Sequence, residues 1–279
     1  MKIDAHQHFW SYNRDEYGWI GDHMDLLKLD FLPPDLHSEL LNAGFDGSVA
    51  VQARQTPEET RWLLKLAAQN DFIKGVVGWA DLRNEDKLRS QLDEFCRSEK
   101  FVGVRHVVHD EPEDNFMLQD EFLNGISILK EYKLTYDLLL FPKHLPVARL
   151  VVEMFPDQKF VIDHISKPLI KNHIIDPWKE DIGAIAEFEN VYCKLSGMVT
   201  EADWAYWKPD DFHPYLDVVF NAFGTDRIMT GSDWPVCLLG GSYCEVTGII
   251  KDHIREFPED TIEKILGMNC IDFYGLQRP

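Results

Sequence analysis

Short runs of β-branched and apolar residues recur along the chain, and a segment with helical periodicity follows each of them. We expect eight strands, at Lys2–His6, Gly47–Gln52, Ile73–Trp79, Phe101–Val107, Leu134–Leu140, Lys159–His164, Val191–Leu195 and Arg227–Gly231. The predicted helices are at about Glu58–Asn70, Glu85–Ser98, Phe122–Tyr132, His144–Phe155, Trp178–Phe188, Tyr215–Phe223, Glu245–Glu256 and Thr261–Met268. This alternation within 279 residues predicts an α/β fold, a parallel (β/α)8 TIM barrel. A doubly wound open sheet is the alternative, but no G-x-G-x-x-G motif follows a strand.

The most clearly marked helix start is the one at Thr56. The Thr56 hydroxyl suits an N-cap, Pro57 suits the first helical position, and Glu59 can reach back toward the cap. We therefore expect a well-defined helix after the second strand.

The connection between the first two strands, about Phe9–Asp46, is much longer than the others. It contains several aromatic residues and two consecutive prolines. We expect a loop at the mouth of the barrel, and a loop of such length is more often functional than idle.

Composition and charge narrow the function. Apolar residues make up 45% and charged residues 27%, as in ordinary globular proteins. Acidic residues number 48 against 28 basic ones, and the net charge of −20 disfavours binding to nucleic acid or to an anionic membrane surface. No apolar run approaches the roughly 20 residues that cross a bilayer, and the first residues lack the apolar region of a secretory signal. The five cysteines are scattered without a C-x-x-C pair, so we expect a reduced, soluble, cytoplasmic protein.

Polar residues gather where the predicted strands end. His6 and His8 end the first strand, and because side chains alternate along a strand, both imidazoles point to the same side, into the barrel. His164 ends the sixth strand and Asp233 follows the eighth. Catalytic groups of such barrels come from the carboxyl ends of the strands. Further polar residues end or lie within other strands: Gln52, Arg54, Arg105, His106 and Asp137.

Each of these residues, when it is taken alone, is also compatible with an ordinary structural role. A His-x-His pair is a weak signal, His164 could be a structural hydrogen-bonding group, and Asp233 could be a turn residue before Pro235. Their joint position at the ends of different strands is the stronger signal, because chance does not favour one end of a barrel. Trp204 lies in a tryptophan-rich segment that is either a wall of a lid or simple packing.

Several segments resemble the amidohydrolase superfamily, and more narrowly its branch of sugar-lactone and pyrone-dicarboxylate lactonases. They are Lys2–Trp10, Val161–Pro168, Leu195–Gly197, Gly231–Pro235 and Asn269–Leu276. The stretches Gln52–Gln55 and Arg105–Pro112 look most like the L-rhamnonolactonase and L-fuconolactonase members. The resemblance implies one amidohydrolase-type barrel domain over residues 1–279, a hydrolase that opens an aldonolactone to its sugar acid.

Residue by residue, His6 and His8 match the family's first-strand pair, His164 its later histidine and Asp233 its last-strand aspartate. The resemblance therefore implies that these four are catalytic and are the ligands of a metal ion, if one is bound. Binuclear members carry a bridging lysine and a further histidine on middle strands. The strand Tyr136–Leu139 has no lysine and Tyr192–Leu195 has no histidine, so we expect one divalent ion, with zinc preferred, or none.

Lactone hydrolysis needs an activated water, a polarised carbonyl and a proton for the leaving alkoxide. Asp233 is the predicted general base, and the three histidines either hold the ion or donate hydrogen bonds to the developing oxyanion. A polyhydroxylated ring needs polar partners, predicted to be Gln52, Arg54, Arg105, His106 and Asp137. It also needs an apolar face to stack on, predicted to be Trp10, Trp204 and Trp234.

The sequence leaves some alternative functions open and disfavours others. A metal-dependent decarboxylase would share the histidines and the aspartate, and an arginine at the mouth would also suit a pyrone or a muconolactone. A serine hydrolase is disfavoured because no serine lies in a G-x-S-x-G frame. A scaffold or sugar-binding barrel leaves the convergence of polar residues unexplained. The expected partner is a small-molecule sugar lactone, and the sequence leaves open whether the chain forms a homo-oligomer.

Overall fold

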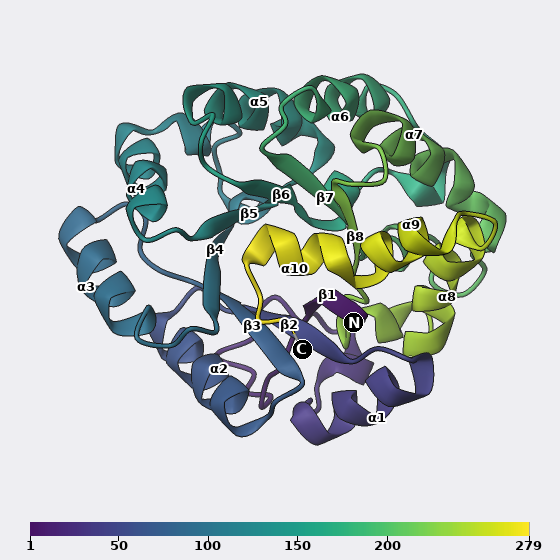
Figure 1. Ribbon diagram of the computed structural model, residues 1–279, viewed down its shortest axis with the longest axis horizontal. Coiled ribbons are helices and arrows are strands. Elements are labelled where there is room, and N and C mark those ends of the chain that lie inside the picture. The colour runs from purple at the N-terminus through teal and green to yellow at the C-terminus, as the bar shows by residue number, and fades with distance from the viewer. Residues whose placement is uncertain (279) are drawn as a thin grey trace.

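The computed structural model describes residues 1–278, and these contain eight parallel strands that pair in sequence order. The strands are β1 Ile3–Gln7, β2 Gly47–Val51, β3 Ile73–Gly78, β4 Phe101–Val107, β5 Thr135–Leu139, β6 Phe160–Ile162, β7 Val191–Leu195 and β8 Ile228–Thr230. Helices surround them as an outer ring (Figure 1). The predicted (β/α)8 barrel and its single-domain architecture are confirmed.

Eight of the described helices lie close to predicted positions, whereas the first and the last, Pro33–Ala43 and Asn269–Tyr274, were not predicted. The described helices are α1 Pro33–Ala43, α2 Pro57–Gln69, α3 Glu85–Phe95, α4 Asp120–Glu131, α5 Leu145–Met154, α6 Trp178–Ala186, α7 His213–Phe223, α8 Tyr243–Ile254, α9 Glu259–Glu263 and α10 Asn269–Tyr274. A π-helical turn, Lys264–Met268, joins α9 to α10. Within the described residues, no helix combines the length and the apolar character that crossing a membrane requires.

The prediction of a loop over Phe9–Asp46 is wrong in part, because α1 lies within this connection. The two prolines that suggested a loop occupy the first turn of α1, where a missing backbone N–H costs nothing. The apolar stripe of α1 is narrow, since its buried residues are only Pro33, Leu36 and Leu40. The remainder of the connection folds over the end of the barrel, where the Trp10 and Phe31 backbones pair.

The barrel closes where β8 returns beside β1. The backbone N–H of Asp233 donates to the His6 carbonyl over 2.8 Å, and the His8 N–H donates to Trp234 over 2.7 Å. Below this seam, the buried Asp4 carboxylate accepts hydrogen bonds from the Ser232 hydroxyl at 2.6 Å and the Tyr243 hydroxyl at 2.9 Å. These bonds hold the ends of the first and last strands together.

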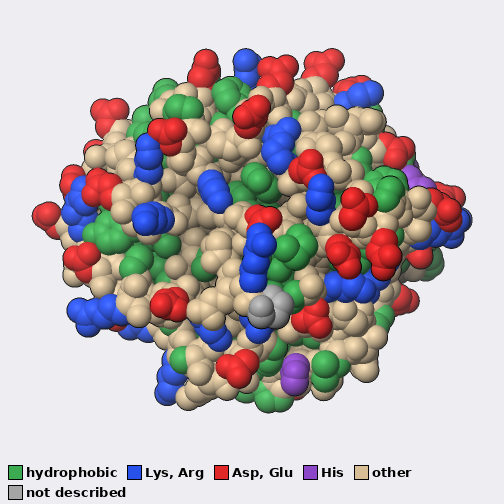
Figure 2. All heavy atoms as spheres, in the orientation of Figure 1, with side chains coloured by type: hydrophobic (Ala, Val, Ile, Leu, Met, Phe, Trp, Pro, Cys, Tyr) green, Lys and Arg blue, Asp and Glu red, His purple; other side chains and the backbone are tan. Residues whose placement is uncertain are grey.

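Helix α10 covers the amino-terminal end of the barrel, which faces the viewer in Figure 1. Its apolar side chains, including Ile271 and Phe273, pack with Ile3 and Val161 of the strands in one buried cluster. Figure 2 shows the same end, where acidic and basic side chains intermingle. The carboxyl ends of the strands therefore point to the opposite end of the molecule, away from this seal.

Candidate active site

The four residues predicted as catalytic meet at the carboxyl end of the barrel. The Nε2 atoms of His6 and His8 lie 3.2 Å apart, and His8 Nε2 lies 3.2 Å from Asp233 Oδ1. The same carboxylate oxygen lies 3.8 Å from His164 Nε2 and 3.9 Å from His6 Nε2. All four side chains are buried. Three imidazole nitrogens thus lie within 3.9 Å of one carboxylate oxygen.

The outer nitrogen of each imidazole has its own partner, which fixes the ring. The Nδ1 contacts are Val51 O for His8 at 2.8 Å, Ser196 Oγ for His164 at 2.9 Å and Asp163 Oδ1 for His6 at 3.2 Å. A backbone carbonyl only accepts hydrogen bonds, so His8 carries a proton on Nδ1, whereas His6 Nδ1 faces both the Asp163 carboxylate and the Lys194 ammonium, each at 3.2 Å. The Nε2 atoms of His6 and His8 then face each other across 3.2 Å, an arrangement that a cation between them would stabilise.

The donor set fits one divalent metal ion. Tetrahedral zinc at its usual bond lengths separates its ligand atoms by about 3.4 Å, close to the 3.2 Å that separates His8 Nε2 from both His6 Nε2 and Asp233 Oδ1. Metal-bound histidines characteristically donate their other N–H to an oxygen, as His8 does. His6, His8 and Asp233 therefore form a candidate set of ligands, and His164 Nε2 lies beside it, 3.8 Å from Asp233 Oδ1.

Burial and mutual contacts set the charges of these groups. Burial alone would raise the pKa of Asp233, but His164, His8 and His6 outweigh it and hold this pKa below the usual range. Burial lowers the pKa of His164 to about 4 and that of His6 well below its ordinary value. At neutral pH the site therefore presents an ionised Asp233 carboxylate beside the neutral imidazoles of His6 and His164, which suits both proton abstraction and metal binding.

A network of buried charges lies beneath the histidines. The Asp163 carboxylate lies 3.0 Å from Arg105 Nη1 and 3.0 Å from Lys194 Nζ. Lys194 also contacts Asp137 at 2.5 Å, and the Tyr274 hydroxyl donates to the same Asp137 oxygen over 2.7 Å. Burial raises the pKa of Asp137 to about 6 despite the ammonium. Burial by itself would lower the pKa of Lys194, but the two carboxylates hold it above its ordinary value.

An unusual backbone segment carries His164 into the site. His164, Ile165, Ser166 and Lys167 all have positive φ, between 47° and 61°. Each such residue other than glycine costs roughly 1–2 kcal/mol, so the surrounding packing must hold this left-handed turn in place. Gly197 permits it, because a Cβ there would lie 2.4 Å from His164 Nδ1. The turn aims both His164 and Lys167 at the same cavity.

A cavity of about 320 Å³ opens beside Asp233. Its polar wall includes Arg105 and the ion pair between Lys167 and Glu201, whose charged atoms lie 2.8 Å apart. Its apolar wall includes Trp204, whose ring stacks on His23 at the rim. The volume suits a small ligand, and the mixed lining suits a polar molecule with one apolar face.

Of the eight residues predicted to bind substrate, two line the cavity, three lie around it and three face away from it. Arg105 and Trp204 line the cavity. Asp137 lies below it in the charge network, and the Gln52 carbonyl accepts a hydrogen bond from Arg105. Arg54 lies at the rim, where it pairs with Glu16 at 2.8 Å.

Three predicted contacts face away from the cavity. His106 points to the outer side of β4, toward Glu111 at 2.7 Å, because its neighbour Arg105 takes the inner side. The Trp10 indole donates to the Leu27 and Leu29 carbonyls inside the long connection. Trp234 packs edge-on against Phe9 and Phe31. These three side chains therefore contact other parts of the protein, and none of them is in the described lining of the cavity.

Sequence reasoning missed several residues of this site: Asp163, Lys194, Ser196, Lys167, Glu201 and His109. A lysine in the middle of the apolar run of β7 was an available signal, since a buried charge requires partners. Glu201 ends a short 3-10 helix, Val199–Glu201, and carried no comparable signal.

Comparisons with known proteins show the family of this chain. The family model described as amidohydrolase matches residues 3–276. An L-fucono-1,5-lactonase of Burkholderia multivorans is 38% identical over 261 residues, which cover 90% of this chain and 88% of that protein. A second protein of that name, from Burkholderia ambifaria, is 34% identical and covers 100% of this chain and 97% of its own length. The crystal structure of a Burkholderia multivorans amidohydrolase with bound zinc is 35% identical, with a TM-score of 0.95 over 99% of this chain and 100% of that one. The chain belongs to the amidohydrolase family.

Proposed function

We propose that this protein hydrolyses a sugar lactone, such as L-fuconolactone or L-rhamnonolactone, to the sugar acid. The observation that carries the proposal is the ionised Asp233 carboxylate, held by three imidazoles at the floor of a cavity of the right size. The lactonase names of the two Burkholderia relatives support the same substrate class.

In the proposed reaction, Asp233 takes a proton from a water molecule as the water oxygen attacks the lactone carbonyl carbon. The carbon–oxygen bond of the ring then breaks, and Asp233 returns the proton to the alkoxide that leaves. Arg105 lines the cavity within 3.3 Å of His6 Nε2, and its guanidinium can donate a hydrogen bond to the developing oxyanion. Atoms and charges balance, since one water is consumed and one hydroxy acid is formed.

One divalent ion, with zinc preferred by the donor set, would be held by His6, His8, His164 and Asp233. When bound, it would polarise the lactone carbonyl and lower the pKa of a bound water. The protein's own part is to fix the three rings through their Nδ1 contacts and to keep Asp233 ionised.

The charges of the cavity favour a neutral lactone over a carboxylated substrate. Arg105 and Lys167 are the basic side chains of the described lining, and both already pair with carboxylates, Asp163 and Glu201. A carboxylated pyrone or aromatic acid would have to compete with these partners. A neutral sugar ring can use the same groups as hydrogen-bond donors and acceptors.

The test is a pH-indicator assay of acid release from L-fucono-, L-rhamnono- and L-galactonolactone. A pyrone dicarboxylate and a dihydroxybenzoate are assayed separately as the substrates of the alternative functions. We expect acid release far above the buffer rate from at least one aldonolactone. Carbon dioxide release from the dihydroxybenzoate, without hydrolysis of any lactone, would instead identify a decarboxylase.

A further inference from the structure

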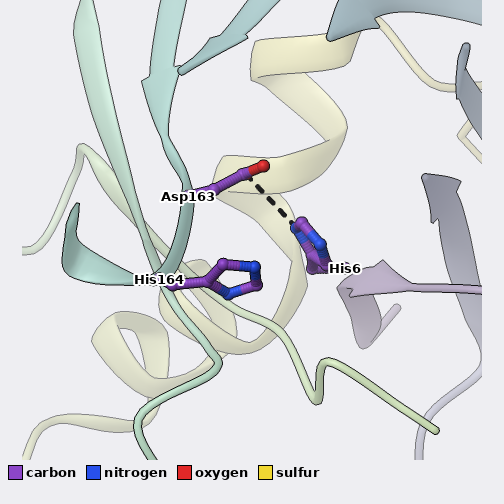
Figure 3. A group of neighbouring side chains, drawn as sticks. All are labelled: His6, Asp163 and His164. Atoms are coloured by element: carbon purple, nitrogen blue, oxygen red, sulfur yellow. Dashed lines mark ion pairs between the residues drawn. The ribbon is translucent and has the colours of Figure 1, made fainter. Parts of the chain in front are cut away.

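A second set of metal-binding groups adjoins the first. His6, Asp163 and His164 each offer a ligand atom, and these atoms lie within 4.8 Å of one another (Figure 3). Asp163 and His164 come from the end of β6, and Asp163 points across the barrel toward His6 on β1. This set shares His6 and His164 with the four-residue site and adds the Asp163 carboxylate, so its donor atoms lie where a second ion beside the first would bind.

The protein's own cations already occupy this second set. Lys194 Nζ lies 3.0 Å from Asp163 Oδ1 and 3.2 Å from His6 Nδ1, the two atoms that face each other across 3.2 Å. On the other side of the carboxylate, Arg105 Nη1 lies 3.0 Å from Asp163 Oδ2. Both oxygens of Asp163 are therefore neutralised by groups on neighbouring strands.

Lys194 is fixed where it lies. Its side chain has no exposure to solvent, and its Nζ lies 2.5 Å from Asp137 Oδ2. Asp137 is itself held by the Tyr274 hydroxyl from α10, and the Tyr274 ring lies 5.5 Å from the ammonium. An ion that bound Asp163 would lie close to the Lys194 ammonium, which has no path to solvent. Repulsion between two positive charges at such a separation is strong in a buried site.

We propose that Lys194 is a resident cation that takes the position of a second metal ion and thereby limits this site to a single ion. This inference rests on the proposed function only in taking the adjacent four-residue site as the place where an ion and the substrate bind. Lys194 acts through Asp163 and His6, so it is a positioning residue and not a catalytic one.

A lysine with a purely structural role predicts a different result when it is replaced. Its loss would lower the stability of the fold and leave the number of bound ions unchanged. A resident cation predicts that its loss frees Asp163 Oδ1 and His6 Nδ1, so that one additional ion binds.

The experiment measures zinc per folded chain by equilibrium dialysis and elemental analysis, for wild type and Lys194→Ala. We expect Lys194→Ala to bind one more zinc ion than wild type, and we expect the added substitution Asp163→Asn to abolish that gain. Tyr274→Phe is the matched control, because it removes a hydrogen bond of Asp137 and keeps the ammonium. It should bind the same number of ions as wild type.

Should Lys194→Ala fail to fold, Lys194→Ala/Asp137→Asn removes one positive and one negative charge together and leads to the same expected gain. A folded variant of either kind without an additional ion overturns the proposal. Wild-type protein that takes up two zinc ions per chain overturns it without any variant. Because ions are counted without substrate, a failure in the lactone assay would refute the proposed function and leave this result standing.

Discussion

Asp233 is the side chain on which the proposed reaction depends most. Three imidazole nitrogens lie within 3.9 Å of its Oδ1 atom, and together they keep it ionised in a buried position where a lone carboxyl would hold its proton. A carboxylate in this state can accept a proton and can bind a cation. The contacts of His6, His8 and His164 with oxygen atoms behind them fix the orientation of the three rings around it.

Replacing Asp233 by asparagine should lower kcat for the lactone by about 10²–10⁴-fold, because the amide cannot accept the proton of water. The fold should persist, as asparagine has nearly the same size. Steady-state kinetics and circular dichroism check both statements. Asp110→Asn, which removes another carboxylate of the cavity wall, is the control and should retain most of the activity. Near-normal rates for Asp233→Asn would remove this residue from the mechanism.

At the scale of elements, the start of α2 links helix capping to the rim of the site. Thr56 accepts the Glu59 N–H as the expected N-cap. The Glu59 carboxylate does not return to Thr56, however, but accepts the Ala53 and Arg54 N–H groups at 3.1 and 2.7 Å. Glu59 thus fixes the loop after β2, which forms part of the cavity wall at Ala53.

This buried carboxyl should make stability depend on pH. Burial raises the pKa of Glu59 from 4.5 to about 8, so between these values the folded chain holds a proton that the unfolded chain has released. The free energy of unfolding should therefore fall by about 2–4 kcal/mol as the pH rises from 4.5 to 8. Glu59→Gln should remove this part of the slope in urea titrations at several pH values. The exposed neighbour Glu58→Gln is the control, and an unchanged slope in Glu59→Gln would contradict the assignment.

At the scale of the whole molecule, the barrel has a sealed end and an open end. Helix α10 packs Ile271 and Phe273 against the strand interiors at the sealed end, and its Tyr274 hydroxyl reaches Asp137 below the site. The seal excludes water from the network of Lys194 and Asp163. The net charge of −20, taken over the whole chain, repels anions, which favours departure of the proposed acid product from the open end.

Removing the apolar anchor of this seal should destabilise the fold without changing the chemistry. Phe273 is 1% exposed and its ring lies 4.7 Å from that of Tyr192, so Phe273→Ala should lower the free energy of unfolding by about 3–5 kcal/mol. The kcat of the folded fraction should stay unchanged. Denaturant titration and an activity assay of the same samples test this. Leu41→Ala, at a position 64% exposed, should change stability by about 0.5 kcal/mol or less.

The sequence predicted the strands well because each strand of a parallel barrel is a short buried run between turns, which is a local property. It failed at α1, where prolines that usually mark a loop occupy the first turn of a helix. It grouped Arg105 and His106 together at the end of β4, whereas the alternation of side chains sends only Arg105 into the barrel.

Hydrophobic periodicity and the position of polar residues at strand ends determined the barrel and brought His6, His8, His164 and Asp233 to one end of it. Only the tertiary structure decided which groups surround them. Lys194 meets Asp137 and Asp163 from strands that are far apart in sequence, and the register of β5, β6 and β7 sets that meeting. Hydrophobic periodicity depends on residues that are close together in the sequence, but an ion pair between strands depends on distances that exist only after the barrel has closed.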